Sequence, residues 1–88
     1  MRVFQLDELK RRLRVLRESF ELTQHDVAML AGVDYKFYQY IESPRKKQIW
    51  LETVNRLAAV YRMELWQFFH PNFLAYAKCP KTRRKPGA

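Results

Sequence analysis

The sequence predicts an all-α domain, and three features of the whole chain support this fold class. The chain has 88 residues, of which 48% are hydrophobic and 15% aromatic, which is enough to bury one core. It has two glycines, and no run of residues alternates between apolar and polar side chains as a half-buried strand does. Its apolar residues recur instead at the spacing of helices.

The first helix is expected over residues 6–21. Its apolar stripe has residues three or four positions apart, namely Leu6, Leu9, Leu13, Leu16 and Phe20. Asp7 and Glu8 near its start suit the positive end of the helix dipole. The arginines that fall off this stripe are expected to face solvent, namely Arg11, Arg12 and Arg14. Arg14 could still reach a phosphate.

A second, shorter helix is expected between Thr23 and Gly32. Thr23 is its predicted N-cap, because the threonine hydroxyl and the Asp26 carboxylate can form the short-acid variant of a capping box. Gly32 is expected to end the helix in the left-handed conformation that glycine adopts at low cost. The segment therefore has a start signal and a stop signal.

A third helix is expected over residues 35–42. Asp34 is its N-cap candidate, and Pro44 prevents its continuation. The expected inward anchors are Val33, Tyr38 and Ile41. The opposite face then carries polar and aromatic side chains, namely Tyr35, Lys36, Gln39 and Tyr40, with Phe37 at its margin.

Two more helices are expected after a basic connector. The fourth is anchored by a second apolar set, Leu51, Val54, Leu57, Ala58 and Tyr61, and no strong cap residue precedes it. The fifth covers residues 64–69 and is ended by Pro71. Its inward residues are expected to include Leu65 and Phe68.

The chain is expected to form one domain over residues 1–71, followed by a basic C-terminal tail over residues 72–88. Residues 72–77 are predicted to be either one further helical turn or an extended arm. From Lys78 onward the sequence has five basic residues, two prolines and no apolar periodicity, so we expect disorder there.

The charge balance favours a polyanionic partner. Lys and Arg number 17 against 9 Asp and Glu, a net charge of +8. Nucleic acid fits this excess, although a membrane surface or a merely solvated face fits it as well. The basic tail, without an adjacent amphipathic or lipidation signal, gives little support for membrane binding.

Several functional classes are disfavoured by what the sequence lacks. The one cysteine, Cys79, allows no internal disulfide and no cysteine-built zinc site, so no metal and no cofactor is expected. The chain has no serine–histidine–acid set and no glycine-rich phosphate loop, so an enzyme is not expected. No small-molecule ligand is expected either. Without a signal peptide or an apolar stretch of about 18 residues, a cytoplasmic, bacterial or phage-encoded protein is the expectation.

Four stretches resemble the phage-repressor-like, Cro-type helix-turn-helix family. They are R-L-R-V-L-R (12–17), L-T-Q-H-D-V-A-M-L-A-G-V (22–33), Y-I-E (40–42) and L-E-T-V-N-R-L-A (51–58). The resemblance covers about residues 6–69. It implies a five-helix repressor-like domain whose second and third helices form a DNA-binding helix-turn-helix.

The resemblance and the residue chemistry together suggest site residues. The predicted base contacts are Tyr35, Lys36, Gln39 and Tyr40, since lysine can donate to guanine and glutamine can pair with adenine in the major groove. The predicted DNA backbone contacts are Thr23, Gln24, Arg45, Lys46 and Lys47. The family also implies that Gln24 buttresses the recognition helix, and that Arg17 and Glu42 form a structural ion pair.

The chain departs from the family pattern at three places. Glu21 replaces the usual glycine before L-T-Q, so either the exit of the first helix differs or Glu21 tolerates an awkward backbone. Ser43-Pro44 replaces a residue-glycine pair after the third helix. The connector that follows is one residue longer than usual and contains Ile49 and Trp50.

The sequence therefore predicts sequence-specific binding of double-stranded DNA and a role as a transcriptional regulator, such as a repressor. A homodimer is one expectation, with a surface formed by Trp66, Phe69, Phe73 and Tyr76, although these residues also suit an ordinary core. The alternative is a protein-binding module of the same fold, antitoxin-like or a repressor partner, because aromatic residues are enriched at protein interfaces.

Overall fold

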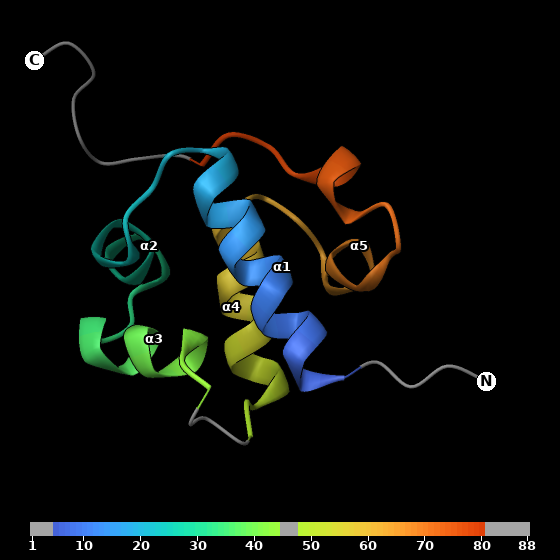
Figure 1. Ribbon diagram of the computed structural model, residues 1–88. Coiled ribbons are helices and arrows are strands. Elements are labelled where there is room, and N and C mark those ends of the chain that lie inside the picture. The colour runs from blue at the N-terminus through green and yellow to red at the C-terminus, as the bar shows by residue number, and fades with distance from the viewer. Residues whose placement is uncertain (1–4, 45–47, 81–88) are drawn as a thin grey trace, which may run out of the picture.

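The computed structural model describes residues 5–44 and 48–80 and is all-helical over that part of the chain. The elements are α1 (Leu6–Ser19), α2 (Gln24–Ala31), α3 (Tyr35–Glu42), α4 (Leu51–Val60), α5 (Leu65–Phe69) and the 3₁₀ helix η1 (Phe73–Tyr76) (Figure 1). The predicted all-α class with five α-helices is confirmed. None of these helices has both the length and the apolar character that crossing a membrane requires.

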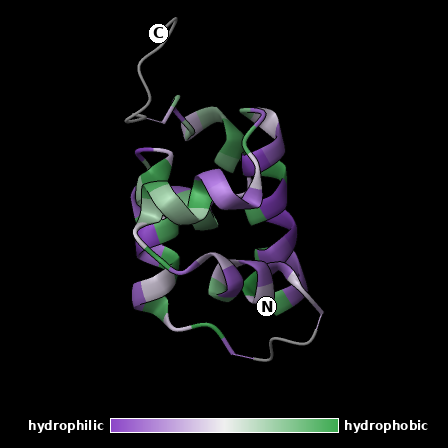
Figure 2. Cartoon of the chain, turned by 90° about the vertical axis from the view of Figure 1, so that its left-hand side faces the viewer, coloured by the Kyte–Doolittle hydropathy of each residue, from purple (hydrophilic) through white to green (hydrophobic). Residues whose placement is uncertain are grey.

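The helices surround one core. In Figure 1, α2 and α3 lie on one side of α1, and α5 and η1 lie on the other. α4 packs against both α2 and α5. The helices carry hydrophilic and hydrophobic residues on the same ribbon (Figure 2), as amphipathic helices around a shared core do. The largest fully buried side chains are Leu13, Leu16, Val27, Tyr38, Ile41, Val54, Leu57, Tyr61 and Phe68.

The ends of α2 and α3 are fixed by the caps that the sequence predicts. The amide of Asp26 donates to the Thr23 hydroxyl at 3.0 Å, and the amide of Thr23 donates to the Asp26 carboxylate at 2.9 Å. The Asp34 carboxylate accepts from the amide of Lys36 at 3.0 Å. These bonds satisfy N–H groups that a helix start leaves without intrahelical acceptors.

Three helices end in the same way, with one residue in the left-handed region. After α2 that residue is Gly32, with φ 72°. After α1 and α4 the residues are Glu21 (φ 56°) and Arg62 (φ 58°), although residues other than glycine rarely adopt this backbone conformation. At Glu21 the following amide, that of Leu22, donates back to the carbonyl of Arg17 at 3.0 Å. Glu21 therefore tolerates the awkward backbone, which is one of the two expectations for this position.

The predicted solvent exposure of Arg12 is wrong, because this side chain is only 7% exposed. Its Nη1 donates to the carbonyls of Phe68 and His70, each at 2.7 Å, at the end of α5, where helix geometry leaves carbonyls without intrahelical donors. Its Nε donates to Glu8 at 2.8 Å, and its guanidinium lies 4.5 Å from the centroid of the Phe73 ring. Burial is tolerated because these donors are satisfied, and the side chain joins α1 to α5 and η1. Arg11 and Arg14 are exposed, as predicted.

The prediction that Leu51 anchors α4 is also wrong. Leu51 is 60% exposed, whereas Val54 and Leu57 are buried. A helical side chain points back toward the N-terminus and covers the preceding turn. Leu51 is the first residue of α4 and has no such turn before it, so its side chain extends beyond the helix end.

The packed structure continues past the expected domain boundary at Pro71. Residues 73–76 form η1, which is the further helical turn that was one of the two expectations for residues 72–77. Phe73 is 5% exposed, and the amide of Lys78 donates to the carbonyl of Tyr61 at 3.0 Å. Of the stretch expected to be disordered, residues 81–88 lie outside the described residues.

Replacing Arg12 by alanine should destabilise the fold by roughly 2–3 kcal/mol, because the carbonyls of Phe68 and His70 lose their donor. Arg11 pairs with the same Glu8 but is exposed, so Arg11→Ala is the matched control and should change stability little. Equilibrium unfolding in urea measures both. Equal losses for the two variants would contradict the role given to Arg12.

At the three residues in the left-handed region, introducing glycine should stabilise the fold and removing glycine should destabilise it. Glu21→Gly and Arg62→Gly each relieve a backbone strain of roughly 1–2 kcal/mol. Glycine also makes the unfolded chain more flexible, which cancels part of this gain, so each variant should be more stable by roughly 0.5 kcal/mol. Gly32→Ala should destabilise by about 1 kcal/mol through the backbone alone, because a Cβ at this position meets nothing within 4 Å. Thermal and urea unfolding measure these changes. Stabilisation by Gly32→Ala would be the contrary result.

Candidate nucleic-acid interface

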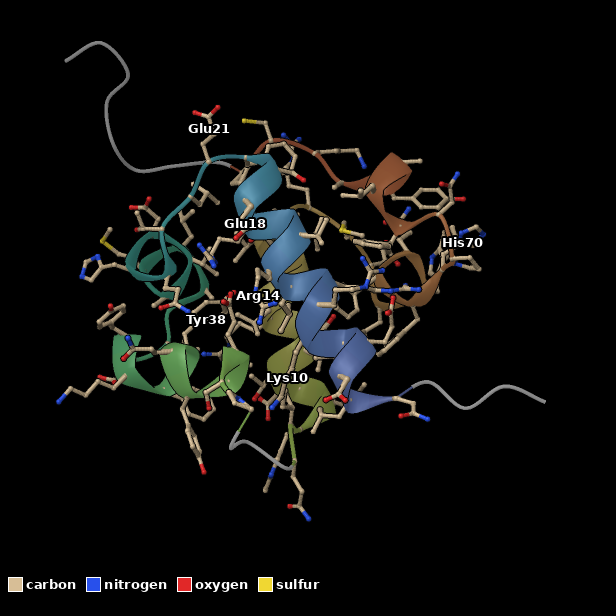
Figure 3. All side chains as sticks on the ribbon, in the orientation of Figure 1. Lys10, Arg14, Glu18, Glu21, Tyr38 and His70 are labelled. Atoms are coloured by element: carbon tan, nitrogen blue, oxygen red, sulfur yellow. The ribbon has the colours of Figure 1, made fainter. Side chains whose placement is uncertain are left out.

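α3 is divided into an inward face and an outward face. Tyr38 and Ile41 have no exposed surface, whereas Lys36 and Gln39 on the other side are exposed. Figure 3 shows Tyr38 pointing from α3 toward α1 and α2. The outward face consists of the four predicted base contacts, with Tyr35 at 39% and Tyr40 at 43% exposure beside Lys36 and Gln39. Phe37 is half-buried at its margin.

The outward face of α3 borders an open hollow near the end of the helix. Its lining residues are Lys36, Gln39, Tyr40, Ser43 and Pro44. A cationic amine, an amide and a phenol therefore lie around one depression. These groups can donate hydrogen bonds to acceptors on a ligand, and the amide and phenol can also accept.

A buried carboxylate holds α3 in this orientation. Arg17 of α1 donates to Glu42 through Nε at 2.9 Å and through Nη2 at 3.1 Å. Gln24 of α2 donates from Nε2 to the same carboxylate at 3.0 Å, and the Tyr38 hydroxyl donates to it as well. Three helices thus meet at Glu42. Arg17 and Glu42 form the ion pair that the sequence resemblance implies.

The electrostatics of Glu42 follow from these contacts. Its side chain is 4% exposed, and burial by itself opposes the ionised form. The hydrogen bonds from Arg17, Tyr38 and Gln24 outweigh burial, so the pKa of Glu42 lies below its usual value. Burial, together with the negative charge of Glu42, raises the pKa of Tyr38, which keeps its hydroxyl protonated as a donor.

Gln24 and Thr23 have structural roles at the start of α2. The amide of Gln24 is bonded to Glu42, and the hydroxyl of Thr23 accepts the capping bond. Helix geometry leaves the backbone N–H groups of Gln24 and His25 without intrahelical acceptors. The same end of α2 can therefore receive an anion. The other predicted backbone contacts, Arg45, Lys46 and Lys47, lie outside the described residues.

Sequence reasoning missed two residues beside this surface. The ring of His25 lies 5.3 Å from that of Tyr35, so α2 contributes an aromatic group next to the outward face of α3. Lys10 is 6% exposed, and its amine donates to the carbonyl of Ser43 at the end of α3. Neither contact could be predicted from a local sequence pattern, because each joins residues from different parts of the chain.

The residues proposed for a dimer surface are not equally available. Phe73 is buried in the core, Phe69 and Tyr76 are half-buried, and Trp66 is 56% exposed. The Trp66 ring packs edge-on against that of Tyr76, with centroids 5.2 Å apart. Phe73 thus belongs to the ordinary core, and a homodimer through the remaining residues stays a prediction.

Comparisons of the chain with models of protein families, with curated proteins and with solved structures found no match. Over residues 5–44 and 48–80, the chain is a small all-helical domain that presents one short helix with a fixed inward face. The exposed side of that helix is basic and aromatic.

Glu42→Gln should destabilise the fold by about 3 kcal/mol at neutral pH, because the half-buried Arg17 loses its charge partner. Since the folded-state pKa lies below the ordinary 4.5, the stabilisation is complete above that value and is lost as the pH falls below it. The difference in the free energy of unfolding between wild type and Glu42→Gln should therefore be smaller at about pH 3 than at pH 7.

The control for this pH dependence is Glu18→Gln. Glu18 lies 3.9 Å from Arg17 but is 63% exposed, so its loss should change stability little at either pH. Urea unfolding at both pH values measures the two variants. A difference for Glu42→Gln that stays constant from pH 7 to pH 3 would exclude the ionised carboxylate as the stabilising group.

Proposed function

We propose that this protein binds double-stranded DNA in a sequence-specific manner and regulates transcription, with α3 entering the major groove. The observation that carries the proposal is the division of α3. Tyr38, Ile41 and Glu42 fix its inward side, and the predicted base contacts lie exposed on its outward side. The resemblance to phage-repressor-like helix-turn-helix proteins points to the same function.

The size of α3 suits this use. Its eight residues correspond to a helix about 12 Å long, and the major groove is about 12 Å wide and admits one α-helix. A helix of this length is not stable alone in water. Its attachment to α1 and α2 through Glu42 supports the proposal, because base reading requires side chains that are held in register.

The outward side chains match known base chemistry. Lys36 would donate to guanine N7 and O6, and Gln39 would pair with adenine N6 and N7. Tyr35 and Tyr40 would contact thymine methyl groups or donate to phosphates. Thr23 and Gln24 at the start of α2, with Arg45–Lys47, would bind the DNA backbone and fix the register of α3. The net charge of +8 would add attraction that is independent of sequence.

A protein-binding module is the alternative function, and the exposed aromatic side chains favour it. Tyr35 and Tyr40 on α3, and Trp66 on α5, are exposed, and such residues are enriched at protein interfaces. Lys36, between the two tyrosines of α3, favours DNA, because lysine is depleted at protein interfaces.

Selection from a random duplex pool tests the proposal, and we expect enrichment of one site. Lys36→Ala should weaken binding to that site roughly tenfold to a hundredfold and change binding to random duplex DNA little. Lys46→Ala, as the control, should weaken both alike and reduce the salt dependence, because it is predicted to contact a phosphate.

Two results would oppose the proposal. Equal losses of specific and random binding in Lys36→Ala would contradict base reading by Lys36. A failure of the selection to enrich any site, together with a defined protein partner whose binding is lost in Tyr40→Ala, would support the protein-binding module instead.

A further inference from the structure

A second hollow lies between α1 and the end of α3. It is lined from α1 by Asp7, Lys10, Arg11 and Arg14, and from the end of α3 by Glu42 and Pro44. Pro44 also lines the hollow on the outward face of α3. The two hollows therefore adjoin at Pro44, and the surface of the proposed interface continues across it to α1.

The charges in this hollow do not cancel. Arg11 is paired with Glu8 at 2.8 Å, and Glu42 is paired with Arg17 at 2.9 Å. Over the whole lining, the three cations of Lys10, Arg11 and Arg14 exceed the two carboxylates of Asp7 and Glu42 by one charge. The hollow is therefore positive on balance, which suits an anion.

Arg14 is the cation that is open to a ligand. It is exposed, and no ion pair or hydrogen bond engages its side chain within residues 5–44 and 48–80. Its neighbours Arg12 and Arg17 are used in the fold, by the carbonyls at the end of α5 and by Glu42. Figure 3 shows Arg14 and Lys10 on the side of α1 that is turned toward the end of α3.

A hydrogen bond between α1 and the end of α3 fixes the two sides of the hollow relative to each other. The Lys10 amine donates to the carbonyl of Ser43, which joins α1 to the residue before Pro44. The volume of the hollow is about 260 Å³ and it opens to solvent. A drug-sized ligand needs roughly 300–1,000 Å³ in a cleft that encloses it, so a single anionic group on a larger molecule fits better.

We propose that Arg14, with Lys10 beside it, binds a phosphate of the same duplex that α3 reads. This inference rests on the proposed function and extends the DNA footprint from α2 and α3 across Pro44 to α1. The contact would position the DNA and would read no base, because a phosphate carries no sequence information.

The test is the affinity of Arg14→Gln for the selected duplex and for random duplex DNA over a range of salt. Loss of one phosphate contact should weaken both roughly fivefold to tenfold at about 0.1 M salt and reduce the salt slope by roughly 0.9. The ratio of specific to random affinity should stay unchanged. Arg14→Lys should keep most of the affinity, and Asp7→Asn should strengthen binding to both duplexes.

Arg62→Gln is the matched control. It removes the same charge from an exposed residue just past the far end of α4, away from the connector that follows α3. Its affinity should change less than about twofold, since only the net charge differs. The unfolding midpoints of all variants, measured by circular dichroism, should match the wild type.

The outcomes separate this inference from the proposed function. Equal effects of Arg14→Gln and Arg62→Gln, with Lys36→Ala still lowering only the specific affinity, would overturn the contact at α1 and leave α3 as the reading helix. A change in the ratio of specific to random affinity in Arg14→Gln would also overturn it. Absence of duplex binding by the wild type would overturn both proposals.

Discussion

The buried carboxylate of Glu42 fixes α3 against α1 and α2. It accepts hydrogen bonds from Arg17 of α1, Gln24 of α2 and Tyr38 of α3, so one side chain connects three helices. A short helix has few contacts of its own to define its rotation about its axis. The carboxylate and the adjacent buried ring of Tyr38 supply that definition, because moving either would leave a buried polar group without a partner.

The orientation of α3 has consequences for the surface around it. With Ile41 inward, the lysine, glutamine and tyrosines of α3 gather on one exposed side. The amine of Lys10 fixes the end of the helix at Ser43, and the side chain of Asp34 caps its start. Each of these two groups bonds to the backbone of the helix or its end. The residues that hold α3 in place therefore differ from those on its exposed side.

Much of this arrangement could be predicted from the sequence, because the signals are local. Apolar spacing located the helices, and cap residues such as Thr23 and Asp34 located their starts. What could not be predicted depends on partners far along the chain. The burial of Arg12 depends on carbonyls at the end of α5, and that of Lys10 on the carbonyl of Ser43. The exposure of Leu51 is an end effect, which a periodic pattern does not contain.

Chemical-shift mapping of the protein with the selected duplex can locate the DNA-binding surface residue by residue. If α3 reads the DNA, the largest amide and side-chain shifts occur on the exposed side of α3 and at the start of α2, with the resonances of Tyr38 and Ile41 changing little. Large shifts confined to α5 and η1, with α3 unaffected, would contradict DNA reading by α3.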